Sequence, residues 1–358
     1  MDKVAIIGTT SWGITIGLLL AAKGTEVRLW ARTEREAKKL RKKGLDPARF
    51  SEVTLPPQIA ITSHLAEAAA EADAAVMAVP SPTMRQNISL LESYLGKSTL
   101  VVSAAKGLEL GSNKRMSQVI AEEINEKLRS NICVLSGPNL AREIMHHLPA
   151  AAVVAAEDTA TAKKAQKILT APNFCVFTNS DIIGVELGGS LKNIIALGAG
   201  IADGLGYGDN GKAAFMTRGL TEITALGMSL GANPLTFSGL AGLGDVIATC
   251  ASPLSRNHYV GEELAKGRKL AEILESMDEV AEGINTTLVA HHLAEQLGLE
   301  MPITEKIYQV LYEDADPRQA AVELMGGNAK HELAGRRWRL FSLFRRRKRT
   351  AAARPQDA

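Results

Sequence analysis

The segment from Asp181 to Asn210 limits what this chain can fold into more than any other stretch. Between Ile182 and Ala202 it carries only two charged residues, Glu186 and Lys192. A helix that is apolar on all sides belongs in the interior of a protein rather than on its surface. The segment therefore predicts a long buried helix with a lysine near its middle.

Lys192 is the residue of this helix whose position needs an explanation. Gly189 and Gly188 stand three and four residues before it, and the small Ala196 stands four residues after it. These neighbours share one helix face, so the spacing predicts open space beside the lysine. A desolvated lysine is suited to acid–base catalysis. The alternative is a core lysine whose stem packs on apolar neighbours while its ammonium reaches solvent.

A strand, a glycine turn and a helix open the chain. Val4–Ile7 is predicted to be a buried parallel strand, Ile14–Lys23 a helix and Glu26–Trp30 a second strand. Gly8 permits the tight turn, and Gly13 lets the helix approach the sheet closely. This order predicts the first βαβ unit of a dinucleotide-binding fold.

The turn of that unit predicts where a cofactor would bind. Its pyrophosphate would lie on the N–H groups at the start of the helix, beside Ser11 and Trp12. Thr10 stands where the usual pattern has its middle glycine, and its side chain leaves less room for the pyrophosphate. Arg32 follows the second strand, where an NAD enzyme often has an acid, and an arginine pairs well with a 2′-phosphate. NADPH is therefore favoured over NADH, although Arg32 is also compatible with an ordinary solvated surface position.

Polar residues follow two of the later predicted strands. Lys106 comes just after Leu100–Ala104, and Gly137 comes just after Ile132–Leu135, in the sequence Ser-Gly-Pro-Asn that ends at Asn139. Ligands gather at the carboxyl ends of strands in open α/β sheets, so a site is predicted there. The other strands expected in this half of the chain are Ala74–Val79, Ala151–Ala155 and a short Val176–Thr178.

After Asn179 the pattern is helical almost to the end. The fold class is therefore α/β, with a Rossmann-like doubly wound sheet domain over residues 1–179 and an all-α domain over 180–335. Residues 336–358 form a tail with eight Arg and Lys residues and no acid between Arg336 and Arg349. We expect this tail to be disordered, the alternative being weak contact with an anionic membrane.

The helical half contains two further candidate groups. Asp245 and Thr249 are one helical turn apart and are expected to face the same space, after a glycine-rich loop over Gly239–Asp245. The second group offers a hydroxyl, a guanidinium and an amide, which together suit a phosphate: Ser255, Arg256 and Asn257.

Composition excludes several classes of protein. The body outside the tail is mildly acidic, because the net charge of the whole chain is only +2, and this argues against nucleic-acid binding. Cys133, Cys175 and Cys250 form neither a CxxC pair nor a disulfide framework, which favours a reducing, cytoplasmic setting. Cys250 is expected to be a packed thiol. The adjacent histidine pairs 146–147 and 291–292 point to different helix faces, so no metal is expected.

Taken in order, the motifs resemble those of bacterial-type glycerol-3-phosphate dehydrogenase that uses NAD or NADP. The resemblance runs from Val4 to about Leu333 and rests on GTTSWG, SAAKGLE, SGPNLAREI, SLKNIIALGAGIADGLGYGDN, GLAGLGDVIATC, SRNHYVG and VAEGINT. Two positions depart from the family pattern, namely Thr10 and Asn139, where the family has glycine and a serine or threonine. The arginine-rich tail is not part of that pattern.

The resemblance implies a role for each matching residue. Lys192 would be the proton acceptor, and Lys106 would contact both substrate and cofactor. The other implied substrate contacts are Gly137, Asp245, Ser255, Arg256 and Asn257, to which Asn139 and Thr249 are added as candidates. The implied cofactor contacts are Ser11, Trp12, Arg32, Ala141, Arg256, Val280 and Glu282, to which Gly8 and Gly13 are added from the turn.

The reaction so implied is the interconversion of dihydroxyacetone phosphate and sn-glycerol 3-phosphate by hydride transfer, which supplies glycerol phosphate for phospholipid synthesis. A homodimer is compatible with such an enzyme. Two other interpretations stay open: a related two-domain NADP-dependent reductase of another 2-keto or 2-hydroxy substrate, and a non-catalytic dinucleotide sensor. A sensor would not need a buried lysine beside glycines.

Overall fold

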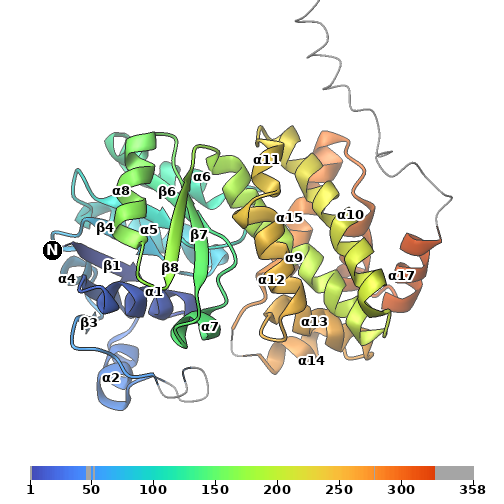
Figure 1. Cartoon of the computed structure of the whole chain (residues 1–358), viewed down its shortest axis with the longest axis horizontal. Helices are drawn as coiled ribbons and strands as arrows, with labels where there is room; N and C mark the ends of the chain where they lie inside the picture. The colour runs from blue at the N-terminus through green and yellow to red at the C-terminus, as the bar shows by residue number, and fades with distance from the viewer. Residues whose placement is uncertain (1, 46–49, 51–52, 278, 327–358) are drawn as a thin grey trace, which may run out of the picture.

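The structure is a computed structural model, and it describes residues 2–45, 50, 53–277 and 279–326. A sheet domain and a helical domain lie side by side, as Figure 1 shows with the sheet on the left and the helices on the right. The expected α/β class, with a Rossmann-like domain followed by a helical one, is confirmed. The tail over residues 336–358 lies outside the described residues.

The sheet has eight strands in the order β3-β2-β1-β4-β5-β6-β7-β8. Neighbouring strands are parallel except for β6 and β7, which are antiparallel. The strands are β1 (Lys3–Ile7), β2 (Glu26–Trp30), β3 (Ile59–Thr62), β4 (Ala74–Met77), β5 (Leu100–Ser103), β6 (Ile132–Ser136), β7 (Ala150–Ala155) and β8 (Phe174–Asn179). The strand order reverses between β1 and β4, which is where an open α/β sheet forms its ligand crevice.

Both faces of the central strands β1, β4, β5 and β6 are buried, which explains why these strands read as continuous apolar runs. Val4 and Ile6 of β1 belong to one buried cluster, whereas Ala5 and Ile7 belong to another. Successive side chains of a strand point to opposite faces, so each face needs its own helical layer. The helices of this domain are α1 (Ser11–Ala22), α2 (Glu34–Lys43), α4 (Leu65–Ala69), α5 (Met84–Leu91), α6 (Met116–Glu123), α7 (Ala141–Met145) and α8 (Thr159–Leu169).

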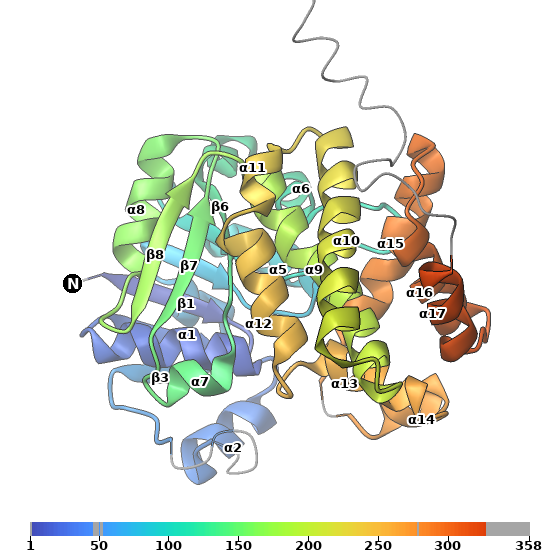
Figure 2. The same cartoon turned by 45° about the vertical axis from the view of Figure 1, so that its right-hand side comes forward.

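The helical domain is assembled around α9 (Ile182–Gly204). From Gly184 to Ala202 every residue of α9 is buried, including Glu186 and Lys192. Its neighbours are α10 (Gly208–Ser229), α11 (Pro234–Phe237), α12 (Asp245–Ala251), α13 (Arg256–Ala265), α15 (Glu282–Leu297) and α16 (Pro302–Tyr312), with α14 (Leu270–Glu275) and α17 (Pro317–Met325) farther out. Figure 2 shows α9 behind α10 and α12, in the middle of this group. The buried helix predicted from composition is therefore the core of the domain.

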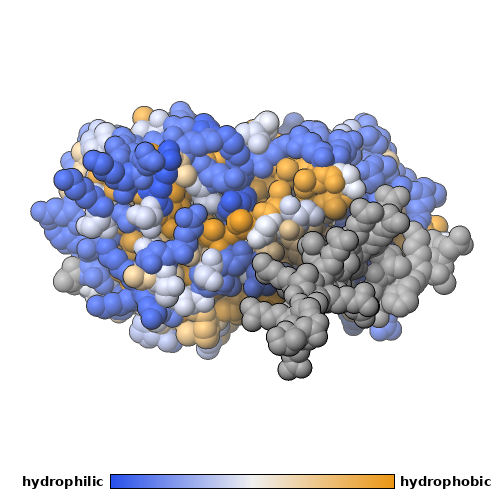
Figure 3. Space-filling model, turned by 90° about the horizontal axis from the view of Figure 1, so that it is seen from above, coloured by the Kyte–Doolittle hydropathy of each residue, from blue (hydrophilic) through white to orange (hydrophobic). Residues whose placement is uncertain are grey.

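Within the described part of the chain, two segments are long and apolar enough to cross a membrane by length and composition alone: Ile182–Gly204 and Pro234–Ala251. The first is almost entirely buried inside the protein, so its apolar character is explained by its position in the core. Seen from above, hydrophilic residues cover most of the sheet domain, and hydrophobic surface gathers near the middle of the molecule (Figure 3).

Two details of the chain differ from the sequence-based expectation. The strand β3 was not predicted, because it is four residues long, lies at the sheet edge and has exposed Ala60 in its interior. The segment Gly239–Asp245 was predicted to be a loop, but Leu240–Gly244 forms a π-helical turn that leads directly into α12. Gly242 makes this turn feasible, since a Cβ there would lie only 2.1 Å from the Phe237 carbonyl oxygen.

Candidate active site

Lys106 and Gly137, predicted at neighbouring strand ends, meet in the structure. Strands β5 and β6 pair in parallel, so the residues that follow them emerge at the same edge of the sheet. The Lys106 ammonium donates to the Gly137 carbonyl oxygen at 2.6 Å. Gly137 has a φ of +129°, a backbone conformation that favours glycine, and a Cβ there would lie 3.0 Å from Ala152 Cα. The strand end is therefore shaped by a glycine and occupied by a cation.

Asp245 joins this strand end to the buried lysine of α9. Its Oδ2 lies 2.7 Å from Lys106 Nζ, and its Oδ1 lies 2.7 Å from Lys192 Nζ. The Asp245 side chain is 2% exposed, and the Lys192 side chain is 8% exposed. Two ammonium groups from different domains thus share one buried carboxylate.

Thr249 completes this cluster. Its hydroxyl lies 3.1 Å from Asp245 Oδ1 and is also bonded to the Lys192 ammonium. The prediction that Asp245 and Thr249 face the same space is confirmed. Because each group has a specific partner, Lys192 is held in a defined orientation rather than reaching for solvent.

The surroundings of Lys106 change the pKa of its ammonium. Burial lowers the pKa of Lys106 to about 8. The neighbouring Asp245 carboxylate opposes this change, and the positive charge of Lys192 adds to it. Lys106 is therefore poised to gain or lose its charge near neutral pH, which is what proton transfer and charge stabilisation at a reaction centre need.

The glycines before Lys192 do not leave the open space that the spacing predicted, and that expectation was wrong. A Cβ on Gly188 would lie 2.7 Å from the Ala241 carbonyl oxygen, and one on Gly189 would lie 2.2 Å from Ser136 Oγ. The two glycines instead let the π-helical turn and the end of β6 approach α9. Their effect is to bring Asp245 and the strand end within reach of Lys192.

The three residues that are predicted to bind a phosphate lie at the start of α13. The Ser255 side chain accepts from the His258 N–H at 3.2 Å and caps this helix. The Asn257 amide donates to Asn193 Oδ1 at 2.9 Å and accepts from the Gly283 N–H at 2.9 Å. Asn257 is therefore already fixed between α9 and α15, and its predicted phosphate contact stays a prediction. The Arg256 side chain is half exposed and donates to the Val280 carbonyl oxygen at 3.0 Å.

Asn193 is a site residue that the sequence analysis missed. Its amide donates to the Lys106 carbonyl oxygen at 3.0 Å and accepts from Asn257, so it connects the strand end with α13. Glu186, the other polar residue that this helix buries near its start, has a structural role: it binds Arg115 at 2.8 Å and the Ser117 N–H at 2.7 Å, and it joins α9 to α6. The sequence does show a polar residue inside an apolar helix at each of these positions, but it does not show which residue forms a hydrogen bond with it.

The turn that is predicted to bind the cofactor lies between β1 and α1. Gly8 has a φ of +110°, and a Cβ there would lie 2.8 Å from the Ala78 carbonyl oxygen. Gly13 is equally tight, since its Cβ would lie 2.6 Å from the Gly8 carbonyl oxygen. Both glycines are thus required by close backbone approach, as expected. Arg32 follows β2, and its exposed guanidinium donates to Gln86 Oε1 at 3.2 Å.

Thr10 fits this turn without strain. Its φ is −64°, its hydroxyl donates to the Ala78 carbonyl oxygen at 2.8 Å, and it accepts from the Gly13 N–H at 3.1 Å. A threonine hydroxyl at this position is a normal helix N-cap. The residue that departs from the usual glycine pattern therefore stabilises the start of α1.

Two segments carry the remaining predicted cofactor contacts: Val280 and Glu282 lie at the start of α15, and Ala141 lies at the start of α7. Glu282 begins α15 and accepts from the Ser81 N–H at 2.8 Å as well as from the Ser81 hydroxyl, just beyond β4. Burial raises the pKa of this carboxyl. Val280 is 46% exposed, and Ala141 is the first residue of α7. Glu282 thus connects the helical domain to the end of β4.

Several buried polar atoms near the crevice have no hydrogen-bond partner among the residues that the structure describes, and they allow a test of whether ligands fit there. They are Trp12 Nε1, Ser103 Oγ, Ser136 Oγ and both side-chain amide atoms of Asn139. A buried polar group without a hydrogen bond is costly, so such groups point to a ligand that would satisfy them. Trp12 lies beside the cofactor turn, and Asn139 follows the Gly137 strand end. The residues present therefore fit both a dinucleotide and a polar substrate.

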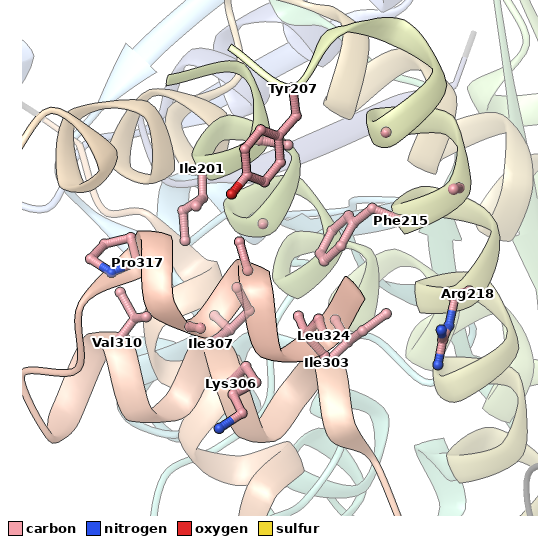
Figure 4. A pocket seen from close by; sticks show the side chains of 16 residues that line it. Ile201, Tyr207, Phe215, Arg218, Ile303, Lys306, Ile307, Val310, Pro317 and Leu324 are labelled. Carbon is pink, nitrogen blue, oxygen red and sulfur yellow. The ribbon is translucent and has the colours of Figure 1, made fainter. Parts of the chain in front are cut away.

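Two other features carry no comparable chemistry. Cys250 is fully buried, and burial raises the pKa of its thiol to about 12, so it is packed rather than nucleophilic, as expected. A pocket of about 690 Å³, part of it open to solvent, lies between α9, α10, α16 and α17. Figure 4 shows that mainly apolar side chains line it, with Arg218 and Lys306 as its labelled cations. It contains neither Lys192 nor Asp245, so it is not the reaction centre.

Comparison with known proteins identifies the family to which the chain is similar. Residues 3–162 match the family model described as the NAD-dependent glycerol-3-phosphate dehydrogenase N-terminus, and residues 181–322 match the C-terminus model of that family. The chain is 62% identical over 350 residues to a glycerol-3-phosphate dehydrogenase, NAD(P)+, of Dehalococcoides mccartyi, with 97% of each chain covered. The corresponding protein of Geobacter metallireducens is 46% identical, with 92% of this chain and 99% of that one covered.

Among solved structures, the glycerol-3-phosphate dehydrogenase of Coxiella burnetii superposes with a TM-score of 0.86 at 34% identity. The match covers 91% of this chain and 99% of that one. The similarity therefore includes both the sheet domain and the helical domain.

Proposed function

The chain belongs to the family of NAD-dependent glycerol-3-phosphate dehydrogenases, and we propose that it interconverts dihydroxyacetone phosphate and sn-glycerol 3-phosphate. Membership makes it an oxidoreductase that uses NAD or NADP and acts on a small molecule. The observation that carries the proposal is the pair of lysines around Asp245, at the edge of the sheet where the cofactor crevice opens.

Lys192 is proposed as the catalytic acid and base. A bound nicotinamide supplies or accepts the hydride at the carbon that changes oxidation state. In the direction of reduction, Lys192 Nζ gives a proton to the forming alkoxide, and in the direction of oxidation it removes that proton. Asp245 and Thr249 hold the ammonium in place, so its proton has a fixed direction.

Lys106 is proposed to stabilise charge at the same centre. Its ammonium is held between the Gly137 carbonyl oxygen and Asp245, at 2.6 and 2.7 Å. A cation in a partly buried site favours an oxyanion far more than a cation in water does. In its charged form Lys106 would thus lower the barrier for forming the alkoxide, next to the cofactor.

The substrate phosphate is proposed to lie near the start of α13. Arg256 offers a guanidinium, and Ser255 and Asn257 are positioned with it at the start of that helix. The Asn139 amide offers a donor and an acceptor that are unpaired within the described part of the chain, which suits a hydroxyl or phosphate oxygen. Gly137 and Thr249 would complete the substrate site.

The cofactor is proposed to lie across the β1 and β4 strand ends, with NADPH favoured over NADH. Arg32 supports this preference because its exposed guanidinium follows β2, where the adenosine ribose of a dinucleotide is held. The residues proposed to contact the cofactor are Gly8, Ser11, Trp12, Gly13, Arg32, Lys106, Ala141, Arg256, Val280 and Glu282.

The wider setting is part of the same proposal. Residues 1–179 would form the dinucleotide-binding domain and residues 180–335 the helical substrate domain. The product would supply phospholipid synthesis in the cytoplasm, and the enzyme would act as a homodimer. The basic tail would make weak contact with anionic membranes, since clustered arginines beside aromatic residues suit such a surface.

A spectrophotometric assay tests the proposal. Adding dihydroxyacetone phosphate to enzyme and NADPH should cause a loss of NADPH absorbance, and glycerol 3-phosphate should form in equal amount. Unphosphorylated 2-keto acids serve as the comparison. Faster reaction with one of them would favour the related two-domain reductase, and NADPH binding without turnover on any of them would favour a sensor.

A further inference from the structure

A carboxylate from the helical domain lies on the N-terminus of α1. The Ser11 N–H and hydroxyl both face Glu279 Oε1, at 3.2 and 2.9 Å. The N-terminus of a helix attracts anions through its N–H groups and its dipole. This is the turn proposed for the cofactor's pyrophosphate, so Glu279 occupies a position where a phosphate oxygen would bind.

The second oxygen of the same carboxylate holds Arg256. Glu279 Oε2 lies 2.9 Å from Arg256 Nη1, and the same nitrogen donates to the Val280 carbonyl oxygen at 3.0 Å. Arg256 is the residue proposed to attract the substrate phosphate. One side chain therefore restrains the anion site of the cofactor and the principal cation of the substrate site.

The segment that carries Glu279 is anchored separately. Glu282, which is half-buried, binds Ser81 beyond β4. The Glu279 side chain is 20% exposed and lies outside any helix. Release of Glu279 from α1 would therefore not require Glu282 to leave the crevice.

We propose that Glu279 is a positioning residue that occupies the cofactor's pyrophosphate position until the cofactor displaces it, and that this displacement releases Arg256 for the substrate phosphate. The inference rests on the proposed function, because it assumes that the pyrophosphate binds at Ser11. Two anions at the same N–H groups repel each other, so the carboxylate and the pyrophosphate exclude one another. Cofactor binding then prepares the substrate site.

This arrangement has a thermodynamic signature. A protein that must first open binds its ligand more weakly, in proportion to the fraction that is already open. If the cofactor releases Arg256, it must also increase the affinity for the substrate, and the coupling must be equal in both directions. A residue with a purely structural role would produce neither effect.

The test uses the full chain, NADPH and glycerol 3-phosphate as probes, and the variants Glu279→Gln and Glu279→Ala. NADPH dissociation constants are measured with and without saturating glycerol 3-phosphate, and their ratio gives the coupling factor. Loss of the competing carboxylate should tighten NADPH binding about threefold to tenfold, and the coupling factor should fall toward 1. Glu275→Gln is the matched control, since Glu275 is an exposed acid four residues earlier, at the end of α14.

The control should retain wild-type values for both quantities. An unchanged or weaker NADPH affinity in both Glu279 variants, or an unchanged coupling factor, overturns the proposal. Thermal unfolding of each variant shows whether it is folded, and Glu279→Gln keeps the size of the side chain if the alanine variant unfolds. Failure of the wild-type protein to bind NADPH or to reduce dihydroxyacetone phosphate would instead refute the proposed function.

Discussion

Replacing Lys192 with Met removes the proposed catalytic proton and keeps most of the side chain's length and apolar packing. In the structure the Lys192 ammonium binds Asp245 at 2.7 Å and also binds Thr249. Asp245 keeps Lys106 as a partner at 2.7 Å after the change, so its carboxylate is not left unpaired. The free energy of unfolding should therefore fall by about 1.5–3 kcal/mol, the usual contribution of hydrogen bonds to a charged group.

The effect on the reaction should be much larger. General acid–base catalysis contributes about 10²–10⁴-fold, so turnover in Lys192→Met should fall by that factor. This corresponds to roughly 2.7–5.4 kcal/mol in the activation barrier. NADPH affinity should hardly change, because the proposed cofactor contacts lie mainly at the β1 and β4 strand ends.

The assay measures turnover with dihydroxyacetone phosphate and NADPH binding on the same preparation. Lys163→Met is the matched control, since Lys163 is an exposed residue of α8 on the sheet domain. Near-normal turnover of Lys192→Met would refute the assignment and direct the search for the proton donor to Lys106. A parallel loss of turnover and NADPH binding would mean that the change had damaged the fold.

A pH profile adds an independent measurement on these proteins. The charge of Lys106 is lost as the pH rises through its pKa of about 8, so kcat/KM of the wild type should fall above that pH. Lys192 contributes to lowering this pKa through charge repulsion, and its removal should move the residual falling limb to higher pH. If kcat/KM of the variant falls at the same pH as in the wild type, the titration of a group other than Lys106 causes the decrease.

Three further predictions concern the cofactor site and the tail. Arg32→Glu should raise the KM for NADPH far more than the KM for NADH, and equal effects on both cofactors would contradict the assigned preference. Thr10→Gly should change NADPH affinity by less than about tenfold, or roughly 1.4 kcal/mol, because Thr10 already has a negative φ. A much larger gain in affinity, measured by titration, would mean that the native turn is impaired. Truncation after Gly335 should leave turnover unchanged, and the truncated protein is compared with the full chain for binding to anionic vesicles. Loss of activity or of folding on truncation would show that the tail is part of the folded enzyme.

The sequence was informative wherever a feature depends on neighbours within a few residues. The apolar run of α9 predicted a buried helix, because an all-apolar helix has no face suited to water. The spacing of Asp245 and Thr249 predicted their shared orientation, since one helical turn places them on the same face. Lys106 was found because it directly follows a recognisable strand.

The contacts that make the site depended on the tertiary structure. Lys106 and Lys192 are separated from Asp245 by 139 and 53 residues, and Ser11 is separated from Glu279 by 268 residues. Hydrophobic periodicity reports which face of an element is buried, but it does not report which element covers that face. Gly188 and Gly189 illustrate this limit of sequence-based prediction. The sequence shows that they have no side chains, but only the fold shows that the π-helical turn and the end of β6 occupy that space.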